Sequence, residues 1–272
     1  MESSFTQTIS LYFSFCKMSL KTQFMFRIDA VLRAVAVFIR EITNVLIVYL
    51  VLIQFPDLGG WNLNEMLFLF SFIFLTYSIL IAIFTGFRDF EEIVYTGALD
   101  RYLIRPRGIM FQLIASQADY LATIGHGAVG IILFLKASSA VGIDWTLQNI
   151  LYLIIALIGG VLIQGAIFIF FSCLNLWFVR TGNIFDMLFY STRKFAGYPL
   201  SIFPKAIQQL LIFVVPFAFV NYFPAQFFLH KADMNNFWNG FMYLSPLVAV
   251  ILFTAVSVFW NISLKKYTST GN

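Results

Sequence analysis

The fold of this chain is decided by residues 66–107, which read MLFLFSFIFLTYSILIAIFTGF and then RDFEEIVYTGALDRYLIRPR. The first part carries no charged side chain and, as a helix, is long enough to cross the hydrocarbon core of a membrane, which is about 30 Å thick. The twenty residues after it hold eight of the thirty charged residues of the chain. A segment suited to lipid is thus followed at once by a concentrated polar surface suited to water.

The composition extends this conclusion to the whole chain. Hydrophobic residues make up 60% of the 272 residues, charged residues make up 11%, and the mean hydropathy is +0.86. Soluble domains have roughly 25% charged residues. We therefore predict an integral membrane protein whose residues 1–272 form a single transmembrane domain, because about six spans with short connections use up the chain. The positions of the basic residues explain the net charge of +4, and no nucleic-acid partner is expected.

Hydropathy predicts six helical spans. Helices are required because an isolated strand would leave its backbone groups unpaired in hydrocarbon, and the alternation typical of a membrane barrel is absent. The predicted fold class is all-α, a polytopic membrane protein with six transmembrane helices. The predicted spans cover residues 36–55, 66–87, 120–140, 150–178, 206–229 and 241–264.

The Lys and Arg residues predict how these spans are oriented. Fifteen of the seventeen precede the first span or lie near its inner end, follow the second or fourth span, or lie in the tail, whereas Lys136 and Lys231 fall on the other side. Basic residues accumulate on the cytoplasmic side, so both termini and the loop at residues 88–119 are predicted to be cytoplasmic. The fifteen are Lys17, Lys21, Arg27, Arg33, Arg40, Arg88, Arg101, Arg105, Arg107, Arg180, Arg193, Lys194, Lys205, Lys265 and Lys266.

Residues 1–35 are predicted to contain an amphipathic helix on the inner membrane surface. Apolar residues recur every three or four positions, at Phe5, Ile9, Phe13, Cys16, Leu20 and Phe24. Polar residues repeat on another face, at Gln7, Ser10, Ser14, Lys17 and Lys21. This pattern is typical of a helix that lies in the interface with its lysines towards anionic headgroups.

Residues 221–240 mix aromatic, proline and polar residues between the last two predicted spans. They fit either a re-entrant element in the outer leaflet or a plain interfacial loop.

Four residues inside the predicted spans are candidate pathway or helix-packing positions. His126 lies in the pattern GHGAVG, which resembles a dinucleotide-binding motif but follows no strand, so close helix packing is favoured. For His126 itself, a hydrogen bond between helices is favoured over proton coupling. Gln164 and Asn175 could bond across helices or line a substrate path. Pro216 invites a kink in the fifth predicted span.

The predicted spans carry few groups that could perform chemistry. Arg40 and Glu41 are expected near the inner end of the first span, where they snorkel or pair with neighbours, and no other acidic residue lies inside a span. Consequently no carboxylate is expected to bind a driving proton or sodium ion. The sequence contains no phosphate-binding loop, HExxH or GxSxG motif. No catalytic, cofactor-binding or metal-binding residue is predicted.

Two parts of the sequence resemble a known family. Residues 97–106, GALDRYLIRP, followed by FQL at 111–113, resemble the segment between spans two and three of export-type ATP-binding-cassette (ABC) permeases of the six-span daunorubicin-permease-like group. A second signature of that group resembles YPL at 198–200, IFP at 202–204, VPFAFV at 215–220 and YFPA at 222–225. The two occur in order, so the resemblance covers nearly the whole chain.

The resemblance implies an export permease subunit, which we expect in a bacterial cytoplasmic membrane. The uncharged span interiors and the 34 Phe residues favour an amphipathic or hydrophobic cargo. The resemblance also implies pairing with a second permease, the same or similar, and with two copies of a separate ABC ATPase. ATP and Mg would bind to that ATPase, and this chain would bind no cofactor and hydrolyse nothing. The loop would hold a coupling helix seated in the ATPase, with its charges fixing the register and Phe90, Ile93 and Tyr95 supplying an apolar anchor. The implied ATPase-coupling residues are Arg88, Asp89, Phe90, Glu91, Glu92, Asp100, Arg101 and Arg105.

Two other classes of function stay open at this point. An autonomous channel or secondary carrier would need an embedded charge such as Arg40, Glu41 or His126 to be central. An intramembrane enzyme would need paired acids, metal ligands or an activated nucleophile, none of which the sequence suggests. The cargo, the direction of transport and the choice between homodimer and heterodimer are not decided by the sequence.

Overall fold

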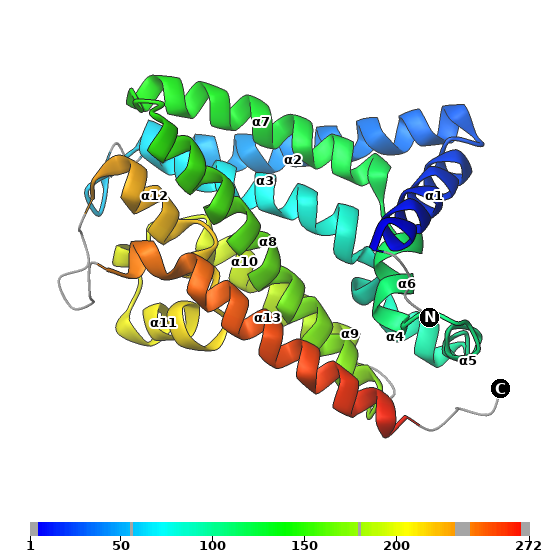
Figure 1. Ribbon diagram of the computed structural model, residues 1–272. Helices are drawn as coiled ribbons and strands as arrows, with labels where there is room; N and C mark the ends of the chain where they lie inside the picture. The colour runs from blue at the N-terminus through cyan, green and yellow to red at the C-terminus, as the bar shows by residue number, and fades with distance from the viewer. Residues whose placement is uncertain (1–4, 55–56, 179–180, 232–239, 268–272) are drawn as a thin grey trace.

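The computed structural model describes residues 5–54, 57–178, 181–231 and 240–267. It is 82% helical, which confirms the predicted all-α class. Figure 1 shows the long helices crossing the molecule and the short ones gathered mainly towards its ends. The long helices are α1 Phe5–Gln23, α2 Arg27–Gln54, α3 Leu63–Arg88, α7 Tyr120–Val141, α8 Leu147–Asn175 and α13 Phe241–Lys265. The short elements are β1 Asp57–Leu58, β2 Trp61–Asn62, α4 Phe90–Tyr95, α5 Leu99–Leu103, α6 Ile109–Ser116, α9 Gly182–Phe185, the π-helical turn η1 Asp186–Tyr190, α10 Ser191–Ala196, η2 Leu200–Ile202, α11 Lys205–Gln209, the π-helical turn η3 Leu210–Val214, η4 Phe217–Phe219 and α12 Tyr222–Leu229.

Five helices of the described chain are long and apolar enough to cross a membrane. They are α2, α3, α7, α8 and α13, and each overlaps one of the predicted spans. We call the end of α3 next to residues 88–119 the loop end, and the opposite end, next to residues 57–62, the hairpin end. In Figure 1, α4, α5 and α6 lie at the loop end together with the last turn of α13.

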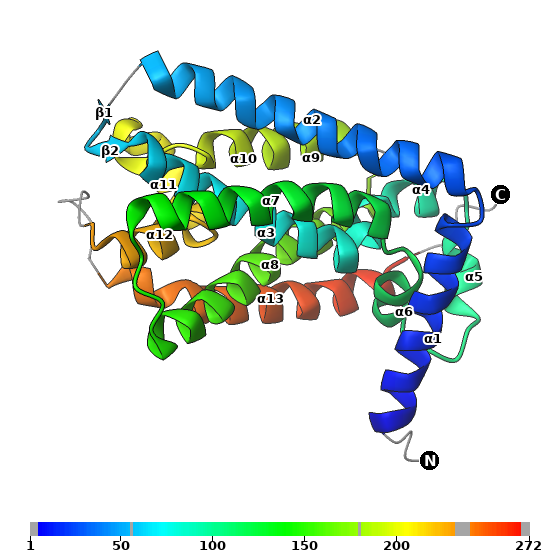
Figure 2. The ribbon, with the colours of Figure 1, turned by 90° about the horizontal axis from the view of Figure 1, so that it is seen from above.

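The first two helices confirm a separate N-terminal helix and change the start of the first span. α2 begins at Arg27, nine residues before the predicted span, because no proline or glycine interrupts residues 27–54. Arg40 and Glu41 consequently lie midway along α2, which corrects the expectation that they sit near its inner end. Figures 1 and 2 show α1 at an angle to α2 and close to α6, while α2 runs beside α7.

The hairpin end is set by local turn chemistry. Gly59 and Gly60 connect β1 to β2 with φ values of 64° and 85°, a region that glycine adopts at little cost. Asn62 then caps α3, because its side chain accepts from the Glu65 N–H at 3.0 Å while the Glu65 carboxylate accepts from the Asn62 N–H at 2.8 Å. This capping box determines where α3 begins.

α3 is the central helix and packs against α7 and α8 (Figure 2). Gly130 of α7 lies so close to α3 that an added Cβ would be 3.0 Å from the Phe74 Cβ and 3.1 Å from the Leu75 backbone nitrogen. An added Cβ at Gly125 would be 2.8 Å from Val37 of α2. Glycine permits this close approach of helices, so the predicted packing role of the GHGAVG pattern is confirmed.

Residues 182–202 form a pass through the molecule that hydropathy did not predict. α9, η1 and α10 make one continuous helix, and the chain then continues to the hairpin end. This segment is antiparallel to α3, because successively later residues contact successively earlier residues of α3 and its flanks. The contacts, in order, are Thr181 with Glu91, Tyr190 with Tyr77, Gly197 with Phe70 and Ile202 with Gly59. The segment was missed because Asp186, Arg193 and Lys194 lower its hydropathy.

Residues 205–229, predicted as the fifth span, are instead a helix pair bent by 74°. Both ends of the pair lie at the hairpin end: Ile202 contacts Gly59 just before it, and just after it Lys231 binds the Gly60 carbonyl and, at 2.7 Å, Glu65. Because it enters and returns on one side, the pair is a re-entrant element, and residues 182–202 make the crossing. The re-entrant element predicted at 221–240 overlaps its second half, and residues 232–239 lie outside the described residues.

The bend follows from the residues at the tip of this pair. Proline has no N–H to continue a helix and disfavours helical geometry in the residue before it. Val215, which precedes Pro216, has φ −123° and ψ 84°. The predicted kink at Pro216 is thereby confirmed. The tip reaches the interior of the molecule, where the Phe217 ring lies 5.4 Å from that of Phe189.

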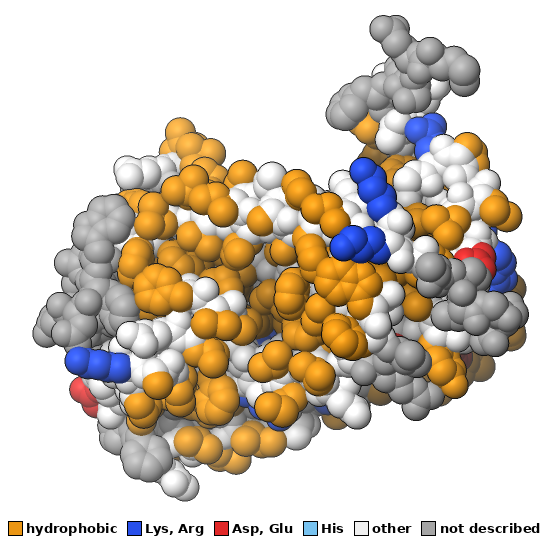
Figure 3. Space-filling view, turned by 90° about the horizontal axis from the view of Figure 1, so that it is seen from below, with side chains coloured by type: hydrophobic (Ala, Val, Ile, Leu, Met, Phe, Trp, Pro, Cys, Tyr) orange, Lys and Arg blue, Asp and Glu red, His pale blue; other side chains and the backbone are white. Residues whose placement is uncertain are grey.

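Three basic residues that were assigned to the connection between the fourth and fifth predicted spans lie elsewhere in the structure. Arg193 and Lys194 lie beside α3 rather than in a connection, and Lys205 lies at the hairpin end. Most of the other Lys and Arg residues still belong to the loop end, so basic residues remain more numerous at the loop end than at the hairpin end. Figure 3 shows one face on which hydrophobic side chains cover the middle, while Lys and Arg appear mainly towards the two ends.

Candidate functional site

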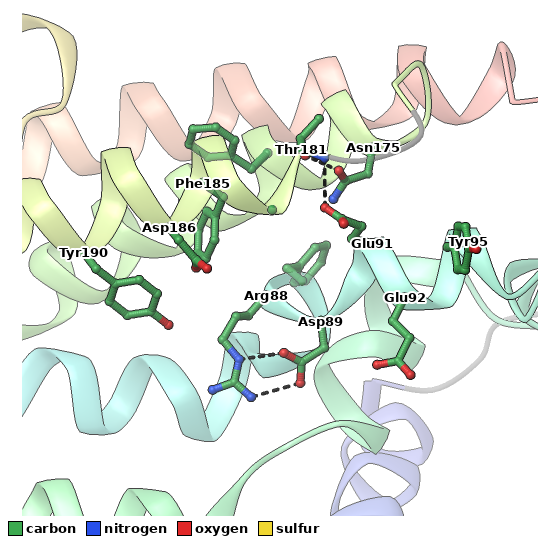
Figure 4. A pocket seen from close by; sticks show the side chains of 13 residues that line it. Arg88, Asp89, Glu91, Glu92, Tyr95, Asn175, Thr181, Phe185, Asp186 and Tyr190 are labelled. Carbon is green, nitrogen blue, oxygen red and sulfur yellow. Dashed lines mark hydrogen bonds and ion pairs between the residues drawn. The ribbon is translucent and has the colours of Figure 1, made fainter. Parts of the chain in front are cut away.

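An acidic pocket of about 520 Å³ lies at the loop end, where α4 meets the residues that follow α8 (Figure 4). The end of α3, the end of α8 and the start of the 182–202 segment complete its walls. One basic and four acidic residues line it, namely Arg88, Asp89, Glu91, Glu92 and Asp186. Four of these five were predicted as coupling residues from the sequence.

Arg88 and Asp89 bind each other in a bidentate ion pair. The Arg88 Nε donates to Asp89 Oδ1 at 2.7 Å and its Nη2 donates to Oδ2 at 2.9 Å. Two parallel charge-assisted hydrogen bonds fix the orientation of both groups. The charge of Arg88 is therefore compensated inside the chain and is not free for a partner protein.

Glu91 ties α4 to the start of the 182–202 segment. Its carboxylate accepts a hydrogen bond from the Thr181 N–H at 2.9 Å, and an added Cβ at Gly182 would lie 3.0 Å from Glu91 Oε2. Thr181 in turn donates its hydroxyl hydrogen to the Asn175 side chain. Glu91 and Asn175 thus form an internal link between α4 and two crossing segments, as the view in Figure 4 shows.

Phe90 does not face a partner protein, which corrects its predicted role as an exposed anchor. Its side chain is completely buried, with its ring 5.1 Å from that of Trp260 in α13. Phe87 lies 5.3 Å from the same indole. Phe90 is therefore an anchor of the loop in the core of its own chain.

The exposed apolar side chains of the loop were missed by the sequence reasoning, apart from Tyr95. Tyr95 and Leu103 are each 49% exposed, and Ile104 is 84% exposed, the largest value for a large hydrophobic residue in the described part of the chain. Glu92, three residues before Tyr95 on α4, is also exposed. The available signal was the apolar pair of residues 103 and 104 inside an otherwise charged loop, ahead of a proline.

The remaining predicted coupling residues lie on or after α5. Asp100 accepts a hydrogen bond from the Tyr267 hydroxyl at 3.4 Å, which joins α5 to the chain that follows α13. Arg105 lies over the Tyr102 ring, 5.5 Å from its centroid. Arg101 is exposed. α5 ends at Leu103, three residues before Pro106, because proline disfavours helical geometry in the residue before it.

A second and larger cavity, of about 1010 Å³, lies between α2, α3, α7 and the 182–202 segment. We call it the intramembrane cavity, because its α3 lining extends from Phe70 to Arg88, over most of the length of that helix. It has an apolar wall and an unusually charged one. The charged residues that line it are Arg33, Arg40, Glu41, Arg88, Asp119, Arg193 and Lys194.

Glu41 and His126 form the buried centre of that charged wall. Glu41 is 4% exposed and accepts from Arg40 Nε at 2.9 Å, while His126 Nε2 lies 3.3 Å from the same carboxylate oxygen. The other ring nitrogen of His126 lies 2.8 Å from the Ala122 carbonyl oxygen. The predicted polar contact of His126 between helices is confirmed, and the same side chain also lines the cavity. The Glu41 carboxylate thus lies inside a crossing helix, contrary to the expectation that no span contains an embedded carboxylate, because α2 starts earlier than predicted.

Arg88 and Tyr190 line both the acidic pocket and the intramembrane cavity. The Tyr190 hydroxyl lies 3.4 Å from that of Tyr77, and the Arg193 guanidinium lies 3.8 Å from the centroid of the Tyr77 ring. A displacement of α4 or of residues 182–190 would therefore alter both cavities, because the same side chains form part of each wall.

The other candidate pathway residues have packing roles. Gln164 is completely buried in α8 and donates to the Thr76 hydroxyl of α3 at 2.9 Å. Asn175 lines the acidic pocket, and Pro216 lies at the tip of the re-entrant pair. None of these three lines the intramembrane cavity. Among the residues that the structure describes, no group of three or more His, Cys, Asp or Glu is arranged to hold a metal ion.

These features define a multi-pass helical membrane protein with a polar intramembrane cavity and a structured loop at one end. A family model described as "ABC-2 family transporter protein" matches residues 38–271. The chain belongs to this family, and is accordingly an ABC transporter permease, a transmembrane component whose family implies partnership with an ABC ATPase. Comparison with curated proteins and with solved structures yields no match.

Proposed function

We propose that this chain is the permease of an ATP-driven exporter, and that an amphipathic or hydrophobic compound passes through the intramembrane cavity. The observation that carries the proposal is the shared wall of the two cavities, formed by Arg88 and Tyr190. An ATPase that pushes on the loop end would move this wall. The permease would then alternate between two access states by rigid-body movement of its helices.

The energy would come from a separate ABC ATPase, which would bind ATP and Mg, and this chain would hydrolyse nothing. Two ATPase copies would act on two permeases, the second being the same chain or a similar one, in a bacterial cytoplasmic membrane. The exposed Tyr95, Leu103 and Ile104 supply the apolar contacts that protein interfaces need at their centre, with Glu92 and Arg101 as charges around them.

The proposed orientation has the loop end and both termini in the cytoplasm, because most Lys and Arg residues belong to that end. Cysteine labelling tests it after the two native cysteines, Cys16 and Cys173, are replaced by serine. We expect a membrane-impermeant maleimide to label Lys136→Cys on intact cells and Arg101→Cys only after the cells are opened. Labelling of Arg101→Cys on intact cells would overturn both the orientation and the ATPase contact.

Association with the ATPase should depend on the exposed apolar residues of the loop. We expect Ile104→Asp combined with Leu103→Asp to weaken binding by about 30-fold or more, because a charge placed in the desolvated centre of an interface costs at least about 2 kcal/mol. Binding is measured with the full-length permease in nanodiscs and the ABC ATPase encoded nearest to it.

The matched control is Leu147→Asp, which makes the same change at a residue 74% exposed at the first position of α8, at the hairpin end. It should leave ATPase binding unchanged. Glu92→Lys is the informative charge reversal, because Arg88 and Glu91 have partners inside the chain. Wild-type association of both the double variant and Glu92→Lys would count against ATPase docking on this loop.

A secondary carrier is the competing function, and the buried Glu41–His126 contact of 3.3 Å favours it. Such a pair could exchange a proton as access alternates. Reconstitution of the permease without ATPase separates the two functions: cargo flux driven by a pH gradient alone would establish the carrier, and flux that requires both ATPase and ATP would exclude it.

A further inference from the structure

The intramembrane cavity carries more positive than negative charge. Five basic side chains line it, and three of them are compensated by a neighbouring carboxylate: Arg33 by Asp119 at 2.6 Å, Arg40 by Glu41 at 2.9 Å and Arg88 by Asp89 at 2.7 Å. Arg193 and Lys194 form no ion pair or hydrogen bond with any residue of the described chain. A surplus of two positive charges thus faces a cavity inside the apolar part of the molecule.

Arg193 is the more unusual of the two. Its Nε atom is buried without a hydrogen-bond partner in the described chain, and its guanidinium instead stacks over the ring of Tyr77. A buried donor without a partner is costly, and more so when it belongs to a charged group. The planar guanidinium is suited to bidentate binding of a carboxylate or phosphate. Its position on the cavity wall leaves that binding edge to an occupant of the cavity.

Apolar side chains line the same cavity next to these basic ones, and the Phe74 ring lies 5.8 Å from the Arg193 guanidinium. Ile47 and Val48 of α2 and Phe70, Ile73 and Phe74 of α3 line it. With about 1010 Å³, the cavity is at the upper end of the size of small-molecule sites. An occupant that satisfies both walls has an anionic head and an apolar tail.

We propose that the intramembrane cavity binds an anionic amphiphile, with its phosphate or carboxylate on Arg193 and Lys194 and its tail against Phe70 and Ile73. This assignment of the cargo class rests on the proposed transport function. The head group could belong to a transported compound or to a bilayer phospholipid, which share this chemistry. Asp119 is ion-paired with Arg33, and Glu41 with Arg40. Glu41 also attracts the Arg193 guanidinium, but the Arg193 Nε has no hydrogen-bond partner among the described residues and stays available.

Binding can be measured without any ATPase, so a failure here is distinct from a failure of the proposed coupling. The full-length chain in a non-ionic detergent is titrated with dodecyl phosphate and with dodecanol, and bound molecules are counted by native mass spectrometry. We expect clear preference for the phosphate. Arg193→Gln should weaken phosphate binding about tenfold or more while dodecanol binding stays unchanged, because one charge-assisted contact is lost.

Lys194→Gln provides a second test at an exposed position, which the fold tolerates if Arg193→Gln proves unstable. Lys136→Gln, an exposed cation of α7 outside the cavity, is the control and should bind as the wild type does. Displacement of dodecyl phosphate by phosphatidylglycerol, but not by phosphatidylcholine, would identify bilayer lipid as an occupant; no displacement would assign the site to the cargo. The proposal would be overturned if the wild-type chain bound dodecyl phosphate and dodecanol equally well. It would also be overturned if Lys136→Gln weakened dodecyl phosphate binding as much as Arg193→Gln or Lys194→Gln does.

Discussion

Replacement of Phe90 by alanine should detach the loop from the helices and abolish most ATP-driven transport. Phe90 is completely buried between the loop and Trp260, and truncation of a buried phenylalanine costs about 3–5 kcal/mol in stability. The exposed side chains of α4 and α5 are not themselves altered, so we expect part of the ATPase binding to persist while stimulated transport falls by at least tenfold. Hydrogen–deuterium exchange of residues 88–107 should rise in the same variant.

The contrast with Tyr95→Ala makes this result specific. Tyr95 lies on the same short helix but is 49% exposed, so its loss should change stability by less than about 1 kcal/mol. We expect it to weaken ATPase association and to leave hydrogen exchange in the loop unchanged. If Phe90→Ala transported at the wild-type rate, the loop would not transmit force through Trp260, and the proposed coupling route would be wrong.

Removal of the Glu41 carboxylate should be the most damaging single change in the crossing helices. The carboxylate is 4% exposed and holds Arg40 at 2.9 Å and His126 at 3.3 Å. Loss of a buried acceptor that binds charged donors costs about 1.5–3 kcal/mol. The Arg40 side chain is itself 61% exposed, so most of this cost falls on the buried His126 side of the contact. We therefore expect Glu41→Gln to lower the thermal stability of the purified protein strongly and to reduce the amount recovered from membranes.

Two further variants show whether charge compensation is the cause. Asp29→Asn makes the same acid-to-amide change at an exposed position in the first turn of α2 and should cost at most about 1 kcal/mol. In the double variant Glu41→Gln, Arg40→Gln, only a small part of the stability lost in Glu41→Gln should return, because Arg40 is 61% exposed and the buried His126 still lacks its acceptor. A double variant less stable than Glu41→Gln alone would show that Arg40 stabilises α2 in another way.

Most of the membrane topology could be predicted because it depends on long apolar runs. Five of the six predicted spans coincide with long helices, since about 20 apolar residues are a strong local signal. The remaining prediction, a fifth span at residues 206–229, was wrong because it depended on the same local signal. Residues 206–229 are apolar but folded back at Pro216, while residues 182–202 cross with Asp186, Arg193 and Lys194 among them. Charged side chains that line a cavity are compatible with a crossing segment, yet they lower the hydropathy by which such a segment is recognised.

The candidate site could likewise be predicted only in part from the sequence. The charged loop was recognisable because eight charges stand out in an apolar chain. Which of its side chains are available to a partner could not be read from the sequence: Phe90 faces Trp260, about 170 residues away, and Glu91 binds Thr181. Ile104, by contrast, stays 84% exposed to solvent within the part of the chain that the structure describes.

The sequence alone determined that this protein is helical, lies in a membrane, has a charged loop and resembles an ABC permease, because hydropathy, charge and short motifs are local properties of the chain. Only the tertiary structure decided that Glu41, His126 and Arg193 share one cavity and that the loop is anchored from within. These relations join residues far apart in the chain, and the packing of α2, α7 and the 182–202 segment against α3 brings them within a few ångströms.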